Sequence, residues 1–371
     1  MIEIILNDLE QLPRSAAVCI VGSSGRNSRL AKVLSVLRPD INITGSFQMA
    51  NSDLFSTKDD LRSQSFRDAL QVTDLVLTTL CKSRQYLQLH RFLGEGRGKG
   101  FLVVNPNFYH PFLSFDETDN AHIEKLRAAR NLLPCAEDRS IYDLAFAVIQ
   151  PRSNLQEVYF RLAELFSRMG RQYFDHVNAS VTGNIIEGGV ADGWVTLQLL
   201  GRFPRSTVYG FDPDSQVFHN SYHKPFLLSS GRFHFQPMGL WKKTDRVPFA
   251  VKKACTSSVK NEKGAITDEH IDTISIDEFV SRQDVRKVDF IKLDIEGSEL
   301  SALEGARETI LSHRPLLAVC IYHQLQHYYE IPFMLSEHTT DYVFRIGHYS
   351  PFHVFSETVL YAIPKELYTG H

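Results

Sequence analysis

The segment DFIKLDIEGSEL, residues 289–300, ends an apolar stretch with charged side chains. Residues alternate between the two faces of a β-strand, so Lys292, Asp294 and Glu296 are expected to point in one direction. Burying an ammonium group and two carboxylates is costly unless they pair or contact a ligand. A carboxylate placed in this way can also accept a proton from a reacting group. We therefore predict functional roles for these three residues, with a structural ion pair as the alternative.

Acids, glycines and a histidine also follow the other predicted strands. Glu187, Gly189 and Gly193 follow the strand NII, Asp212 ends the strand STVYGF, and His323 follows the strand LLAVCIY. Ligands of open α/β sheets bind at the carboxyl ends of the strands, where glycine lets the backbone approach closely. An acid about twenty residues beyond a glycine loop can accept hydrogen bonds from a ribose diol. The pattern predicts a nucleoside-containing ligand at this edge.

The acid that ends the first of these strands limits the kind of ligand. A dinucleotide favours a G-x-G-x-x-G loop whose amides bind pyrophosphate, but here Glu187 stands in place of the first Gly-x-Gly. A carboxylate repels phosphate and suits a cationic ligand. S-adenosylmethionine carries a cation and a ribose diol and has no phosphate. The alternative is that Glu187 and the glycines form an ordinary tight turn.

Four segments resemble the FkbM-type methyltransferases, a branch of the class I S-adenosylmethionine-dependent enzymes. They are IIEGGVADGWVT, VYGFDPD, TISIDEF and VDFIKLDIEGSELSALEGARETILSHRPLLAVCIYH, and the resemblance covers roughly residues 170 to 365. The family more often has Asp where this chain has Glu187, and the bulky Trp194 after the glycine loop could constrict the pocket. The resemblance implies an α/β fold with a seven-stranded, mostly parallel sheet whose last strand is antiparallel.

The resemblance also implies roles for individual residues. It makes Glu187, Gly189 and Gly193 the cofactor loop, Asp212 the ribose acid and Met238 a residue packed on adenine. Methyl transfer to a hydroxyl needs close positioning and a base.

We expect Asp294 or His323 to be that base, because neighbouring parallel strands would bring them together. Lys292 would orient the acceptor oxygen or keep Asp294 ionised, and Glu296 would line the cleft. A divalent metal on Asp294, Glu296 and His323 is compatible with these types, but no ligand spacing requires one, and we predict none.

The order of the predicted elements divides the chain into three parts. Residues 1–115 alternate strands and helices, which indicates a smaller Rossmann-like α/β domain. Residues 116–180 have helical periodicity and are interpreted as a connector, and residues 181–371 form the methyltransferase domain. The first part resembles the small Rossmann-like domains attached to some sugar-modifying enzymes and FkbM-type proteins. Those often have Asp where Gln48 stands, so a scaffold or oligomerisation role is the alternative to ligand binding.

Composition and charge limit partners and location. The net charge of -3 predicts no nucleic-acid partner and no attraction to anionic membranes. No apolar run approaches the roughly 20 residues that a membrane span requires. Five scattered cysteines without a CxxC pair are typical of a reducing compartment, and the acidic start MIEIILNDLEQ does not suit a signal peptide. We expect a cytoplasmic protein without membrane insertion that could form a homo-oligomer.

Together these patterns predict an S-adenosylmethionine-dependent O-methyltransferase that releases S-adenosylhomocysteine. Its acceptor would be a hydroxyl of a sugar, glycan or related polar metabolite, a substrate class that comes from the resemblance. One alternative is a nicotinamide-dependent enzyme of nucleotide-sugar metabolism, which the absence of G-x-G-x-x-G disfavours. The other is a non-catalytic binding protein on a methyltransferase fold.

Overall fold

The computed structural model describes residues 5–6, 12–22, 24–48, 63–78, 89, 101–104, 120–149, 170–177, 181–250, 258–259, 270–350 and 356–370. The chain divides into two compact units, which are described separately. The first comprises residues 1–119, 144–166 and 351–354, and the second comprises residues 120–143, 167–350 and 355–371.

The first unit contains a five-stranded sheet in the order β1-β5-β4-β2-β3, in which every pairing is parallel. This confirms the α/β prediction for the N-terminal part. Its elements are β1 Ile5–Leu6, β2 Ala17–Gly22, α1 Ser24–Leu37, β3 Asn42–Gln48, α2 Gln64–Gln71, β4 Leu75–Thr78 and β5 Phe101–Val104.

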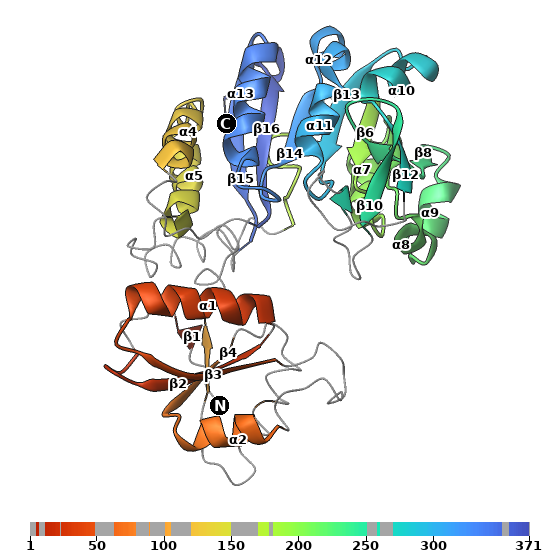
Figure 1. Ribbon diagram of the computed structural model, residues 1–371. Coiled ribbons are helices and arrows are strands. Elements are labelled where there is room, and N and C mark those ends of the chain that lie inside the picture. Colours follow the sequence, from red (N-terminus) through yellow and green to blue (C-terminus); the bar gives the residue numbers. More distant parts are fainter. Residues whose placement is uncertain are drawn as a thin grey trace. The chain divides into compact units, whose positions relative to one another are not determined.

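Strand β2 explains why helices cover both faces of this sheet. Val18 and Ile20 belong to one apolar cluster, which includes Leu30 and Leu34 of α1. The intervening Cys19 and Val21 belong to a second cluster with Phe66 and Leu70 of α2. Strand residues alternate between faces, so an uninterrupted apolar strand needs a helix on each side. Figure 1 shows α1 and α2 on opposite faces of the sheet.

The second unit contains a seven-stranded sheet in the order β15-β16-β14-β13-β6-β7-β8. The strands are β6 Asn184–Gly188, β7 Thr207–Phe211, β8 Phe233–Gln236, β13 Val288–Leu293, β14 Leu316–Cys320, β15 Tyr342–His348 and β16 Thr358–Pro364. The helices on this part of the chain are α7 Trp194–Arg202, α8 Ser215–His219, α9 Lys224–Ser229, α10 Ile276–Arg282, α11 Glu299–Glu304, α12 Arg307–His313, α13 His327–His338 and the short η6 Lys365–Leu367.

The last strand gives this sheet its one reversal among the described strands. Strand β16 runs antiparallel to both of its neighbours, β14 and β15, whereas the other pairings are parallel. The seven-stranded, mostly parallel sheet with its antiparallel last strand was therefore predicted correctly. The carboxyl ends of β6, β7, β13 and β14 meet at one edge, as parallel strands require.

A small separate sheet forms from the chain between β8 and β13. It has the order β11-β10-β12-β9, with β9 Gly239–Leu240, β10 Asp245–Ala250, β11 Ser258–Val259 and β12 His270–Ile274. The segment RFHFQPMGL is divided between β8 and β9. Pro237 stands at the division and has no N–H for a ladder, so the strand ends before it.

Two helices precede the main sheet, α4 Asn120–Arg130 and α5 Ala136–Ile149. Within the second unit, α4 packs against α13, and Asp138 of α5 forms a buried ion pair with Arg345 of β15. The sequence also predicts helices at residues 84–94 and 155–170, and of these residues the structure describes only Leu89 and Gly170. No helix among the described residues has the length and apolar character needed to cross a bilayer.

Candidate active site

A pocket of about 300 Å³ opens where β6, β7, β13 and β14 end. Four predicted site residues line it: Gly189, Asp212, Asp294 and Glu296. The other predicted residues, Glu187, Gly193, Met238, Lys292 and His323, are not among the described lining residues. Apolar side chains of Phe211, Leu240 and Ile271 line the same pocket. Four of the nine predicted site residues therefore line one pocket at the strand ends.

The glycine loop after β6 needs glycine at two positions. Gly189 has φ +80°, and a Cβ there would lie 1.9 Å from the carbonyl oxygen of Asp294. Gly193 has φ +82° at the N-cap of α7, and a Cβ there would lie 2.5 Å from Leu227. Left-handed backbone and close approach both favour glycine. The loop is thus pressed against the end of β13, next to the pocket.

Asp212 supports the same loop from β7. Its Oδ2 accepts a hydrogen bond from the Ala191 amide at 2.8 Å, and its Oδ1 accepts one from the Asp214 amide at 2.9 Å. Burial raises the pKa of Asp212 above its ordinary value. A carboxylate oxygen has more than one lone pair, so Asp212 can still accept hydrogen bonds from a ligand in the pocket.

Glu187 lies beneath the loop and not in the pocket. It is completely buried; its Oε2 accepts from the Thr196 hydroxyl at 2.7 Å, while its Oε1 accepts no hydrogen bond from the described residues. Burial raises its pKa to about 7, although Lys292 and Thr196 oppose that shift. The Glu187 side chain therefore does not contact the space in which a ligand would bind.

Lys292 also points under the loop. Its ammonium group donates to the carbonyl oxygens of Gly188 at 3.0 Å and Gly189 at 2.7 Å. It lies 4.0 Å from Glu187 and 5.0 Å from the centre of the Tyr173 ring. The side chain is 2% exposed. The structure thus favours the bracing alternative over contact with an acceptor.

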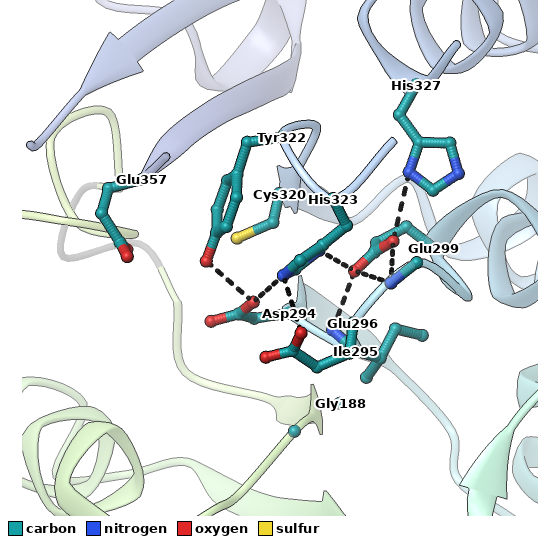
Figure 2. A network of polar contacts seen from close by, with 12 residues as sticks. Gly188, Asp294, Ile295, Glu296, Glu299, Cys320, Tyr322, His323, His327 and Glu357 are labelled. Atoms are coloured by element: carbon teal, nitrogen blue, oxygen red, sulfur yellow. Dashed lines mark hydrogen bonds and ion pairs between the residues drawn. The ribbon is translucent and has the colours of Figure 1, made fainter. Parts of the chain in front are cut away.

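Asp294 faces the pocket and is held by two phenol groups. Its Oδ2 accepts from Tyr173 at 2.6 Å, and its Oδ1 accepts from Tyr322 at 3.3 Å. Burial raises the pKa of both tyrosines, so both keep their protons and act as donors. His323 Nε2 is 3.5 Å from Asp294 Oδ1. Figure 2 shows Tyr322 and His323 converging on this carboxylate, which gives it a fixed orientation.

His323 is surrounded by carboxylates. Its Nδ1 is 2.8 Å from Glu299, and its Nε2 is 3.7 Å from Glu296 in addition to the contact with Asp294 (Figure 2). Burial lowers the pKa of His323, but these acids outweigh it and raise the pKa to about 9. The imidazole is therefore protonated at neutral pH and cannot accept a further proton, which favours Asp294 as the base of the predicted pair.

Glu299 organises the turn between β13 and α11. It is completely buried and accepts from the amides of Ile295 at 2.9 Å and Gly297 at 3.0 Å, as well as from His323. Burial opposes ionisation, but His323 and His327 lower the pKa of Glu299 well below its ordinary value. The ligand atoms of Asp294, Glu299 and His323 lie within 4.8 Å of one another. Because the Glu299 oxygens already serve these donors, we assign no metal to this group.

The protonation of His323 predicts a pH dependence of stability. A folded-state pKa of about 9 exceeds the ordinary value of 6.5, so its contribution is fully present below pH 6.5 and is lost as the pH rises through 9. We expect His323→Gln to remove on the order of 2–3 kcal/mol at pH 6 and much less at pH 10.

Urea unfolding of the two proteins across this pH range measures the difference. His234→Gln, at an exposed histidine, is the control. A constant difference between wild type and His323→Gln at all pH values would contradict the assignment.

Sequence reasoning missed three residues around Asp294. Tyr173 lies in the segment assigned to the connector, yet its hydroxyl contacts Asp294. Its neighbour Gln172 donates to Tyr173 at 3.0 Å and to Glu357 at 2.6 Å, and Glu357 lines the pocket just before β16. Burial raises the pKa of Glu357. Residues 172, 294 and 357 are far apart in sequence, so no local spacing could have linked them.

Met238 does not take the place expected for it. It is half-buried after β8, whereas the adjacent Gly239 and Leu240 line the pocket. The division of the strand at Pro237 is the local cause, because Gly239 and Leu240 pair with β12 in the small sheet. The apolar wall of the pocket therefore includes Leu240, Phe211 and Ile271.

Comparisons with known proteins agree with this fold. Residues 187–346 match the family model for the methyltransferase FkbM domain. Among solved structures, the chain is similar to methyltransferase FkbM from Methylobacillus flagellatus KT. The two share 20% identity, with 97% of this chain and 94% of that chain covered and a TM-score of 0.59. At 20% identity this match shows the fold alone.

More distant structures also match. A putative rRNA methylase from Clostridium thermocellum has 12% identity, covers 49% of this chain and 87% of its own, and gives a TM-score of 0.32. An O-methyltransferase from neocarzinostatin biosynthesis, solved with S-adenosylmethionine and 2-hydroxy-5-methyl naphthoic acid, has 11% identity. It covers 67% of this chain and 69% of its own, with a TM-score of 0.30. No curated protein sequence matches the chain.

Proposed function

We propose that this protein is an S-adenosylmethionine-dependent O-methyltransferase, because residues 187–346 match the family model for the methyltransferase FkbM domain. Its acceptor is a hydroxyl of a sugar, glycan or related polar metabolite, and S-adenosylhomocysteine is the product. The observation that carries the proposal is the pocket at the strand ends, which Gly189, Asp212 and Asp294 line together. The acceptor class rests on the resemblance to the family.

The residues present fit this cofactor. Gly189 lets the loop pack against the end of β13, because a Cβ there would lie 1.9 Å from the Asp294 carbonyl oxygen, and both residues line the pocket. Asp212 would accept from the ribose diol, and Phe211, Leu240 and Ile271 offer apolar contact to adenine. When bound, the cofactor supplies an electrophilic methyl group on a sulfonium. The cofactor has no phosphate group that the acids of the pocket would repel.

The chain itself would position the acceptor and take its proton. Asp294 lines the pocket and is oriented by Tyr173 and Tyr322, so a hydroxyl entering the pocket can donate to it. His323 Nε2 lies 3.5 Å from Asp294 Oδ1 and helps to hold this carboxylate in place. A placed base contributes typically about 10²- to 10⁴-fold to the rate, and positioning of the two reactants provides the rest.

The alternatives are less compatible with the pocket. Five carboxylates line it, from Asp212, Asp214, Asp294, Glu296 and Glu357, and no Lys or Arg is among the described lining residues. A nicotinamide dinucleotide or a nucleotide sugar carries a pyrophosphate, which this lining would repel. A non-catalytic binding protein remains the second alternative, and turnover separates it from the enzyme. We propose a small-molecule or glycan acceptor, no nucleic-acid partner and a cytoplasmic location.

Calorimetric titration with S-adenosylhomocysteine tests the cofactor, with NAD and UDP-glucose as parallel ligands. We expect micromolar binding of S-adenosylhomocysteine alone. Binding of NAD or UDP-glucose without S-adenosylhomocysteine would overturn the assignment. Transfer of tritiated methyl from S-adenosylmethionine to a panel of sugars and glycans then tests the reaction.

Asp212→Ala is expected to weaken S-adenosylhomocysteine binding by roughly 1–3 kcal/mol, the cost of losing a hydrogen bond to a charged group. The same titration measures it. Asp272→Ala, at an exposed aspartate of β12, is the control and should bind as wild type does. Unchanged affinity in Asp212→Ala would remove Asp212 from the cofactor site.

A further inference from the structure

We propose that Lys292 is a positioning residue that sets the shape of the cofactor loop through its backbone carbonyls. It does not contact either reactant. The inference rests on the proposed function, because it concerns how the same loop binds the cofactor. It replaces the expected role of Lys292 beside the acceptor.

The strongest contacts of Lys292 are to the backbone. Its ammonium group donates to the Gly188 carbonyl at 3.0 Å and to the Gly189 carbonyl at 2.7 Å, whereas Glu187 is 4.0 Å away. Glu187 has a hydrogen bond of its own from Thr196. The ion pair therefore offsets buried charge, while the directed hydrogen bonds of Lys292 act on the loop.

Two consecutive carbonyls determine the orientation of two peptide groups. A peptide unit is planar, so holding its oxygen also sets the direction of its N–H. Lys292 thereby orients the peptides that join residues 188, 189 and 190, at the point where Gly189 has φ +80°. The Gly189 amide meanwhile donates to Phe211 at 2.9 Å. The loop is thus held from β13 on one side and from β7 on the other.

The Gly188 carbonyl accepts a second hydrogen bond, which links the loop to the end of β13. The Gly188 carbonyl also accepts from the Asp294 amide at 3.1 Å. This one oxygen therefore contacts both the Asp294 backbone and the Lys292 side chain at the end of β13. Figure 2 shows Gly188 close to the Asp294 turn. Lys292 therefore couples the loop that would bind the cofactor to the carboxylate that would receive the acceptor proton.

A double-mutant cycle separates this role from that of a counter-ion. Lys292→Met keeps the length of the side chain but removes its donors. Glu187→Gln keeps the shape of Glu187 and its acceptor for Thr196 while removing the charge. Stability is measured by thermal unfolding without ligand, and affinity is measured by calorimetry with S-adenosylhomocysteine. Lys242→Met, at an exposed lysine of the same unit, is the control.

We expect Lys292→Met to unfold at a lower temperature and to bind S-adenosylhomocysteine at least tenfold more weakly. The double variant carries no lone buried charge, so its unfolding temperature should return towards wild type while its affinity stays at least tenfold weaker. Even if Lys292→Met fails to fold, the double variant provides the affinity.

Recovery of affinity to within threefold of wild type in the double variant would overturn the proposal, because Lys292 would then act only as a counter-ion. Wild-type affinity in Lys292→Met would overturn it as well. Absence of binding by the wild type is a different result, since it would reject the proposed cofactor itself. The four proteins together thus distinguish failure of the inference from failure of the function.

Discussion

Asp294→Asn is expected to reduce methyl transfer by about 10²- to 10⁴-fold while S-adenosylhomocysteine affinity stays within a few fold of wild type. Asparagine has nearly the same shape and keeps an oxygen that can accept from Tyr173 or Tyr322, so the pocket should keep its form. It cannot take a proton from an acceptor hydroxyl at neutral pH. Tritium transfer from S-adenosylmethionine measures the rate, and calorimetry measures the affinity.

The matched control is Glu304→Gln, which neutralises an exposed carboxylate on α11 of the same unit. It should leave both rate and affinity unchanged. If Asp294→Asn lost affinity and turnover to the same degree, Asp294 would be a structural residue of the strand end. Undiminished turnover would show that Asp294 is not the base. Another carboxylate that lines the pocket, such as Glu357, would then be the candidate.

Gly189→Ala should destabilise the second unit and abolish measurable cofactor binding. The left-handed backbone alone costs about 1–2 kcal/mol for alanine. The new Cβ would also lie 1.9 Å from the Asp294 carbonyl oxygen, so the loop or the strand end must move. Either movement breaks the contacts that Gly189 makes with Phe211 and Lys292. Urea unfolding and titration with S-adenosylhomocysteine measure the two effects.

Gly201→Ala is the control for this substitution. Gly201 lies within α7, and a Cβ there would meet no atom within 4 Å. Alanine is the better helix former by about 1 kcal/mol, so this variant should be as stable as wild type or more stable, with unchanged affinity. A Gly189→Ala protein that bound as wild type does would show that the loop can rearrange freely, against the close approach described above.

The sequence alone determined the architecture of the second unit and the edge that carries its pocket. Short segments rich in apolar residues predicted the parallel strands, and Glu187, Asp212 and Asp294 marked where those strands end. These are local signals, because strand period and strand termination depend on neighbouring residues. Since parallel strands end at a common edge, Gly189, Asp212 and Asp294 could be brought together without coordinates.

The tertiary structure decided where the charged side chains point. Strand alternation predicted one direction for Lys292, Asp294 and Glu296, but β13 ends at Leu293 and Glu296 adopts φ +55°, so the alternation stops there. Lys292 turns to the loop carbonyls, because a buried ammonium group must find acceptors where the backbone provides them.

The spacing of residues in the sequence could not identify the partners of Asp294 either. Tyr173 is 121 residues away from it in sequence, and Gln172 joins Tyr173 to Glu357 across 185 residues. His323 was identified as a strand-end residue, yet its proton is held by Glu299, whose burial no sequence pattern indicated. Protonation and hydrogen bonding depend on distances between such residues, and those distances exist only once the chain has folded.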